Sequence, residues 1–123
     1  MNTVKIAVIQ IRTELEQDVT LEKAGRMVHE AAENGAQIAV LPEMFNCPYS
    51  RHYFRPIAHL GHEKTVAAMS QWARDNSVLL VGGSIPETEG ENIYNTCFVF
   101  DEQGRQIARH RKVHLFDVDI PGM

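Results

Sequence analysis

Three uninterrupted apolar runs constrain the fold of this 123-residue chain more than any other feature of its sequence. They are Ile6-Ala7-Val8-Ile9, Ile38-Ala39-Val40-Leu41 and Val78-Leu79-Leu80-Val81. None of them alternates with polar residues, which is typical of parallel strands that are covered on both faces. We therefore expect one α/β domain in which these runs lie in the same sheet, since the chain is long enough for one core and too short for two.

The segment between the first two runs has helical periodicity. Four apolar residues recur there at spacings of three and four, which places them on one helix face; they are Leu21, Ala24, Val28 and Ala31. Asp18 or Thr20 is expected to cap the start, and Asn34-Gly35 to end the helix. A second helix is expected from about Glu63 to Asn76. The resulting strand–helix–strand unit predicts a right-handed crossover.

A hairpin is expected near the end of the chain. Ile93 to Phe100 and Gln106 to Lys112 are predicted strands, and Asp101 to Gly104 form the turn, where glycine tolerates a positive φ. Between the third apolar run and this hairpin lie Gly82-Gly83-Ser84 and a polar stretch that ends at Glu91-Asn92. Gly82-Gly83-Ser84 follows a strand but matches neither phosphate-loop pattern, so nucleotide binding is not expected.

Composition and charge exclude several classes of partner. Hydrophobic residues make up 44% of the chain, and the formal charge of −4 argues against nucleic-acid or anionic-membrane binding. The densest basic stretch, Arg109 to Lys112, is followed at once by Asp117 and Asp119. From the sequence we expect neither a secretory leader nor a membrane-spanning segment. Two cysteines make no disulfide framework, so we expect a cytoplasmic protein.

A long connection, Pro42 to His62, separates the second apolar run from the second predicted helix. Structureless loops of this length are uncommon in compact domains and are often functional. This one is rich in aromatic and cationic side chains that suit a pocket wall, and Tyr49 is a candidate to contact a substrate. Arg51, His52 and Arg55 are candidates to bind a substrate carboxylate, with plain solvation as the alternative for each.

Glu43 lies just beyond the second apolar run, behind a proline that fixes the turn. Ligands of open α/β sheets bind outside the carboxyl ends of strands. Apolar neighbours would partly desolvate the carboxyl and raise its pKa, as a general base working near neutral pH requires. The alternative is a loop carboxylate that caps a helix or faces water.

Lys112 ends the last predicted strand, where alternation places His110, Lys112 and His114 on one face. A lysine directed into a site could neutralise Glu43 or stabilise a developing oxyanion. The alternative is a solvated basic edge strand, which discourages edge-to-edge pairing. The spacing of His110 and His114 suits a zinc site on a helix rather than on a strand, so no metal is expected.

In combination, Pro42-Glu43 and Arg111-Lys112-Val113-His114-Leu115 resemble the glutamate and lysine motifs of the nitrilase, or carbon–nitrogen hydrolase, superfamily. Further segments extend the resemblance over essentially the whole chain: Lys5 to Gln10, Ala31 to Ala36, Gly82 to Glu87, Tyr94 to Cys97 and Phe116 to Gly122. The segment Met44-Phe45-Asn46-Cys47-Pro48-Tyr49 most resembles the omega-amidase branch of the family.

The resemblance implies half of an α-β-β-α sandwich, with a mixed sheet and helices on one face, and an intact protein that forms a homodimer or larger oligomer. Residues 1–123 would be the N-terminal part of a single hydrolase domain. It implies a cysteine thiolate that attacks a small linear amide, with Glu43 as general base and acid and Lys112 stabilising the oxyanion. The products are a carboxylate and ammonia, and no metal or organic cofactor is needed.

The family's nucleophile is expected beyond Met123, since neither cysteine has its context. Cys47 is expected to shape the pocket, with a partly exposed reactive thiol as the alternative. Cys97 is expected to be a small buried hydrophobe. We therefore expect residues 1–123 alone to be inactive. The alternative is a non-catalytic α/β module that binds a partner or ligand through the sheet face left exposed for the missing half.

Overall fold

The computed structural model describes residues 2–114. The elements in chain order are β1 (Ile6–Val8), α1 (Gln17–Glu33), β2 (Ile38–Val40), α2 (Arg51–His59), α3 (Glu63–Asn76), β3 (Leu79–Val81), β4 (Ile85–Glu89), β5 (Asn92–Phe100) and β6 (Gln106–Arg111). The segment Phe116 to Gly122, part of the family resemblance, lies outside the described residues.

The three apolar runs pair as parallel strands in the order β1-β2-β3, as predicted. Strand β5 is antiparallel to β3, and β6 is antiparallel to β5 along its other edge. Strands β3 and β4 follow one another along the same edge of β5, and the break between them is bridged by Gly82, whose N–H donates to the Phe98 carbonyl at 2.8 Å. The sheet is therefore mixed.

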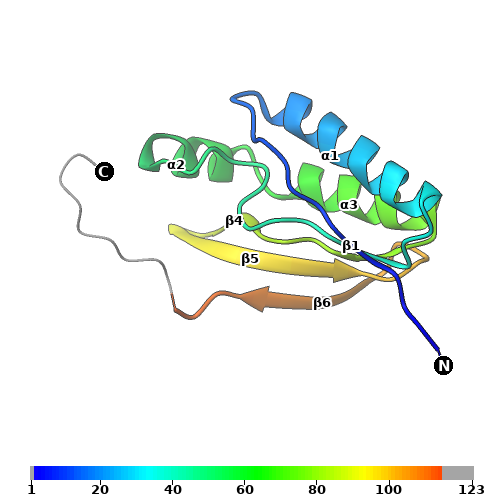
Figure 1. The fold of residues 1–123 in the computed structure, drawn as a ribbon. Coiled ribbons are helices and arrows are strands. Elements are labelled where there is room, and N and C mark those ends of the chain that lie inside the picture. Colours follow the sequence, from blue (N-terminus) through cyan, green and yellow to red (C-terminus); the bar gives the residue numbers. More distant parts are fainter. Residues whose placement is uncertain (1, 115–123) are drawn as a thin grey trace.

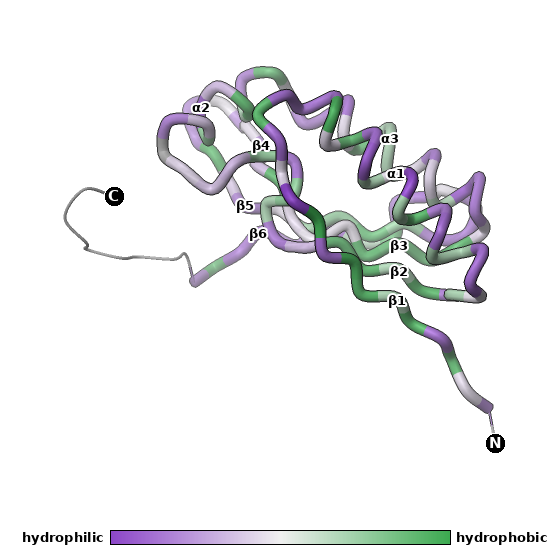
Figure 2. The backbone as a smooth tube through the Cα atoms, turned by 45° about the horizontal axis from the view of Figure 1, so that its top comes forward, coloured by the Kyte–Doolittle hydropathy of each residue, from purple (hydrophilic) through white to green (hydrophobic). Residues whose placement is uncertain are grey.

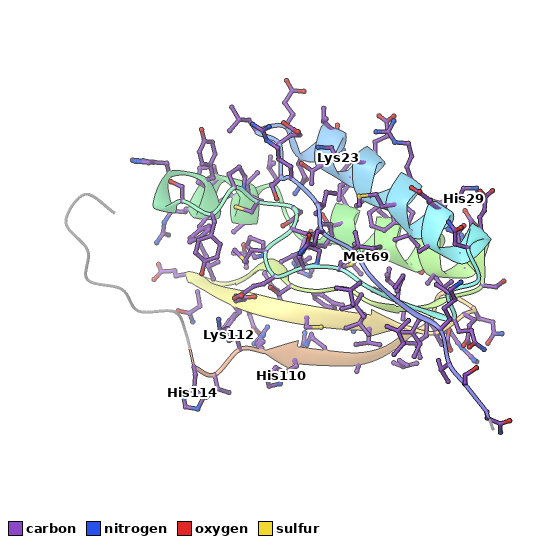
Figure 3. The ribbon with its side chains drawn as sticks, viewed as in Figure 1. Lys23, His29, Met69, His110, Lys112 and His114 are labelled. Carbon is purple, nitrogen blue, oxygen red and sulfur yellow. The ribbon has the colours of Figure 1, made fainter. Side chains whose placement is uncertain are left out.

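The helices α1 and α3 cover one face of this sheet (Figure 1). Their apolar faces pack on the strand residues that point toward them, and Met69 of α3 lies fully buried between the helix layer and the sheet (Figure 3). The largest fully buried apolar side chains of this core include Phe45, Phe100, Met69, Leu80, Ile85 and Val28. The predicted fold class, a mixed α/β sheet with helices on one face, is confirmed.

The opposite face of the sheet is bare in the part of the chain that the structure describes. Ile6 and Val8 are 56% and 76% exposed, so the expectation that the apolar runs are covered on both faces is wrong for residues 2–114. Figure 2 shows the runs of β1, β2 and β3 as adjacent hydrophobic segments. The register aligns a continuous apolar row across the face: Val8, Val40, Val81, Val99 and Ala108.

The helix predictions are mostly confirmed. Helix α3 has the predicted bounds, and α1 ends at Asn34-Gly35, where Gly35 has a φ of +91°. The predicted N-caps are wrong, because α1 begins after Glu16 and places Asp18 and Thr20 inside its first turn. The Thr20 hydroxyl still accepts a hydrogen bond from the Glu14 N–H at 2.9 Å, so it satisfies a backbone group just outside the helix.

Two elements were not predicted from the sequence. Helix α2 occupies part of the expected loop, capped by Ser50, whose hydroxyl accepts from the His52 N–H at 3.3 Å. Its short length and internal Pro56 hide the helical pattern. Strand β4 was missed because it contains Pro86 and charged residues. The hairpin of β5 and β6 is confirmed, with Gly104 at a φ of +80°.

Within residues 2–114, no helix combines the length and the apolar character needed to cross a membrane.

Candidate active site

The directions of the strands bring Glu43 and Lys112 to the same end of the sheet. Because β3 is parallel to β2, and β5 and β6 each reverse direction, β6 runs the same way as β2. Glu43 lies just past the carboxyl end of β2, and Lys112 lies just past that of β6. The Lys112 Nζ donates to Glu43 Oε1 at 2.8 Å, so the structure unites the two sequence-predicted site residues.

The backbone turn that carries Glu43 rests on the break between β3 and β4. The Ser84 hydroxyl accepts from the Met44 N–H at 2.9 Å, and Met44 has a φ of +53°. Gly83 has a φ of +60°, and a Cβ there would lie 2.1 Å from the Pro42 carbonyl oxygen. Gly83 therefore allows the close backbone approach that holds the Glu43 turn, and Ser84 adds a side-chain hydrogen bond to it.

Asn95 of β5 links the two residues and was not among the sequence candidates. Its Nδ2 donates to Glu43 Oε1 at 2.9 Å, and its carbonyl accepts from the Lys112 N–H at 2.8 Å. The Asn95 Oδ1 is buried and makes no hydrogen bond within the described residues. The only signal for Asn95 was its place in the segment Tyr94 to Cys97, which carries part of the family resemblance.

The Lys112 hydrogen bond holds the pKa of the Glu43 carboxyl below its ordinary value, and the smaller effect of burial works in the opposite direction. The same bond raises the pKa of Lys112. The prediction of a raised Glu43 pKa is thus wrong for this state, because the side chain is 49% exposed and ion-paired rather than desolvated. At rest the pair consists of a carboxylate and an ammonium.

Two cavities open beside the pair and share Asn95 and Lys112. One, of about 190 Å³, has mostly apolar and aromatic walls, made by Met44, Tyr49, Phe54, Ile93, Tyr94, Asn95 and Lys112. The other, of about 370 Å³, is the larger of the two and is lined by Glu43, Gly83, Ser84, Asn95, Cys97, His110 and Lys112. Lys112 therefore borders both cavities, and Glu43 lines only the larger one.

The candidates from the long connection are placed differently. Tyr49 forms a wall of the smaller cavity and meets Phe54 edge to face, with ring centroids 5.4 Å apart. Arg51 is the first residue of α2. His52 and Arg55 are exposed and line neither described cavity. The structure thus brings Tyr49 to Lys112, but not His52 or Arg55.

The two cysteines have contrasting environments. Cys47 is 2% exposed, and burial raises the pKa of its thiol to about 12, so the alternative of a partly exposed reactive thiol is wrong. Cys97 is only half-buried and lines the larger of the two cavities with Glu43 and Lys112, so the expectation of a buried hydrophobe is wrong in part. Burial raises the pKa of the Cys97 thiol more than the backbone hydrogen bond involving Gly82 lowers it.

Two histidines flank Lys112 in the sequence: His110 lies on β6, and His114 lies beyond its end (Figure 3). His110 lines the larger of the two cavities, and pairs across the ladder with Cys97. Among residues 2–114, no three His, Cys, Asp or Glu side chains gather in a way that could hold a metal ion.

Comparison with known proteins identifies the family. The family model for carbon-nitrogen hydrolase matches residues 5–123. The chain is a member of the carbon–nitrogen hydrolase family. It is 42% identical over 122 residues to omega-amidase NIT2 of Mus musculus, covering 99% of this chain and 44% of that protein.

Solved structures agree with this assignment. Nit3 of Saccharomyces cerevisiae, a member of branch 10 of the nitrilase superfamily, has a TM-score of 0.82 at 33% identity, over 90% of this chain and 44% of that one. A mutant amidase from Nesterenkonia sp. AN1, showing Michael addition of acrylamide at its active site cysteine, has a TM-score of 0.81 at 27% identity, over 94% and 46%. The chain spans less than half the length of these relatives.

Proposed function

We propose that residues 1–123 are part of a carbon–nitrogen hydrolase domain that converts a small linear amide to a carboxylate and ammonia through a cysteine thioester. The 2.8 Å contact between Lys112 Nζ and Glu43 Oε1 at the carboxyl end of the sheet carries the proposal. A relative named omega-amidase and a structural neighbour with an acrylamide-modified active-site cysteine support it. The nucleophile is proposed to come from outside these residues.

The proposed chemistry divides between the two charged groups. Glu43 accepts the thiol proton as sulfur bonds to the amide carbon, and the carbonyl electrons move to oxygen, where Lys112 donates a hydrogen bond. When the tetrahedral species collapses, the carbon–nitrogen bond breaks and Glu43 returns the proton to the leaving ammonia. Glu43 then takes a proton from water as the water oxygen attacks the thioester carbon. When the carbon–sulfur bond breaks, Glu43 returns that proton to the sulfur, and the carboxylic acid ionises to the carboxylate. The scheme uses no metal or organic cofactor.

Because of the ion pair with Lys112, the base strength of Glu43 depends on whether substrate is bound. While Lys112 donates to Glu43, the pKa of the carboxyl stays low and the group is a weak base. An amide oxygen that accepts the Lys112 hydrogen bond removes that stabilisation and excludes water, and both effects raise the Glu43 pKa. Proton abstraction is therefore favoured only with substrate in place.

The substrate class follows from the smaller cavity. Its apolar and aromatic walls beside Lys112 suit the short chain of a linear amide. His52 and Arg55 line neither cavity, so a substrate carboxylate that reached them would have to extend toward α2. Assembly of the intact domain into a dimer or larger oligomer is part of the proposal, and the family resemblance supports it.

Ammonia release from a small linear amide tests the proposal, measured on the native protein as its gene encodes it. Glu43→Gln and Lys112→Gln should each lower the rate by a factor on the order of 10³. Glu14→Gln is the matched control, because Glu14 pairs with Lys23 at 2.7 Å and lines neither cavity. Equal rates for the Glu43 and Glu14 variants would exclude the proposed mechanism.

The location of the nucleophile has its own test. Residues 1–123 alone should release no ammonia above the uncatalysed rate. If they hydrolysed the amide at an enzyme-like rate, and Cys97→Ala or Cys47→Ala abolished it, the nucleophile would lie within the chain.

The bare sheet face favours a second candidate function, a non-catalytic module that binds a partner. Ile6 and Val8 on this face are 56% and 76% exposed, and exposed apolar faces of this kind are typical of surfaces that the rest of a domain or another protein covers. Size-exclusion chromatography of residues 1–123 should show self-association. A well-behaved monomer would count against a docking face of either kind.

A further inference from the structure

A buried ion-pair cluster lies on the helix side of the sheet, directly behind Lys112. Its centre is Glu87 of β4, which is 3% exposed. Glu87 Oε1 accepts from the Thr96 hydroxyl and from Arg111 Nε, both at 2.8 Å. Arg109 donates to Glu87 Oε2 at 3.3 Å. Both carboxylate oxygens of Glu87 are therefore engaged.

Arg111 is held from three directions. Besides its bond to Glu87, a terminal nitrogen of the guanidinium contacts Glu89 Oε2 at 2.6 Å. The guanidinium carbon also lies 4.0 Å from the ring centre of Tyr94, in cation–π geometry. A planar guanidinium bound on two edges and one face has little freedom to rotate.

Strand alternation connects this cluster to the candidate active site. Arg111 and Lys112 are consecutive and point to opposite faces, as do Tyr94 and Asn95 of the paired strand. On the helix side Arg111 packs on Tyr94; on the open side Lys112 and Asn95 both donate to Glu43 Oε1. Fixing the first pair of residues fixes the backbone that carries the second.

Lys112 lies at the end of an edge strand, where side chains that hold the strand have the most effect. Lys112 follows the last residue of β6, which pairs with β5 and no other strand in residues 2–114. The end of an edge strand opens readily unless side chains hold it. The Lys112 N–H bond to the Asn95 carbonyl is the last backbone hydrogen bond of this ladder among the described residues.

We propose that Glu87 is a positioning residue, which acts through Arg111 to hold Lys112 Nζ at hydrogen-bond distance from Glu43. The proposal rests on the proposed function for the meaning of that distance, but the distance can be tested without catalysis. It assigns a role in the reaction to a buried ion pair on the far side of the sheet, with no contact to substrate.

The competing interpretation is that Glu87 only stabilises the fold. Asp101 supplies a matched control, because its carboxylate also pairs with a β6-side arginine, accepting from Arg105 Nε at 2.8 Å, at the opposite end of the same hairpin. Asp101→Asn should weaken the hairpin turn without moving Lys112. Glu87→Gln removes the charge that holds Arg111, and keeps the shape of the side chain.

The decisive readout is the titration of the Glu43 carboxyl in residues 1–123, followed by ¹³C NMR. In Glu87→Gln the titration midpoint should move up toward the ordinary glutamate value, and in Asp101→Asn it should stay at the wild-type position. The other groups that border Glu43 are unchanged in both variants: Lys112, Asn95, His110 and Cys97. An unchanged midpoint in folded Glu87→Gln would overturn the proposal.

A second variant covers the case in which Glu87→Gln does not fold. Arg111→Lys, at a partly exposed position, keeps the charge but loses the planar fork, and should move the Glu43 midpoint in the same direction. No movement in this folded variant would equally overturn the proposal.

In the native protein, Glu87→Gln should lower kcat on the order of 10²-fold, as expected for a misplaced catalytic group, with a smaller change in KM. Asp101→Asn should leave both parameters close to wild type. A kcat equal to wild type in folded Glu87→Gln would contradict positioning. Failure of the proposed function is recognised separately, as a Glu43→Gln variant that retains full activity.

Discussion

Glu43 and Glu87 are two carboxylates held by neighbouring cations at the same end of β6, on opposite faces of one ladder. Each accepts a hydrogen bond at 2.8 Å, Glu43 from Lys112 and Glu87 from Arg111. They differ in burial: the Glu43 side chain is 49% exposed and that of Glu87 is 3% exposed.

The difference separates a group available for chemistry from one that holds structure. For Glu87, burial favours the neutral acid, but hydrogen bonds from Arg111 and Thr96 outweigh it and keep the pKa below its ordinary value. Its oxygens are fully used and enclosed. Among the described residues, Glu43 receives two side-chain hydrogen bonds, both on Oε1, and it borders a cavity from which it is accessible.

The largest expected effect concerns how Glu43 is placed. Gly83→Ala should destabilise the fold by about 3 kcal/mol, because it adds a Cβ 2.1 Å from the Pro42 carbonyl oxygen at a positive φ. Gly90→Ala is the matched control, since Gly90 has the same φ of +60° with nothing within 4 Å, and should cost about 1 kcal/mol. Urea unfolding measures both. Equal costs would show that the Glu43 turn does not depend on the close approach.

The next effect compares the carboxylates directly. Glu87→Gln should lower the free energy of unfolding by about 2 kcal/mol, because it leaves two arginines without their buried partner. This value is below the full cost of breaking a buried ion pair, since both arginines are partly exposed. Glu43→Gln should change it by less than about 1 kcal/mol, as for a surface ion pair. Denaturant unfolding at neutral pH checks both values. A larger cost for Glu43 would reverse the assignment of roles.

Acid should lower the stability of the fold through both carboxyls. Both carboxyls have a folded-state pKa below the ordinary value of 4.5, so the unfolded chain binds more protons in acid. Their contribution to stability is present above pH 4.5 and is lost as the pH falls through the lowered pKa values. Stability measured by urea unfolding across this range should fall less steeply in Glu87→Gln. A slope unchanged from wild type would show that Glu87 does not contribute.

The smallest effect concerns the two thiols. Cys97 borders the same cavity as Glu43, whereas Cys47 is enclosed with a pKa of about 12. Ellman's reagent should therefore label one cysteine in folded residues 1–123 and both in denaturant. Cys97→Ala should remove the fast reaction and Cys47→Ala should not. Fast labelling of Cys47 would mean that its loop opens in solution.

The sequence predicted the fold well where the pattern is local. The apolar runs, helix α3 and the hairpin could be read from periodicity and turn residues. Helix α2 and strand β4 could not, because Pro56 and Pro86 break the patterns and tertiary contacts decide the structure.

The candidate site was predicted in part. The positions of Glu43 and Lys112 followed from strand ends and motif order, and their contact is present. The predicted direction of the Glu43 pKa shift was wrong, because the apolar neighbours of Glu43 in the sequence leave its side chain 49% exposed, and the Lys112 ammonium donates to it. Asn95 and Glu87 reach their partners through pairing across strands, which leaves no local pattern in the sequence.

The central claim is that Glu43 and Lys112 act as one unit in amide hydrolysis, and a double-mutant cycle on the rate of ammonia release tests it most directly. In the native protein, the Glu43→Gln/Lys112→Gln double variant should be no more than about tenfold slower than the slower single variant, because residues of one catalytic unit are strongly non-additive. A double variant whose loss equals the product of the two single losses would contradict the claim.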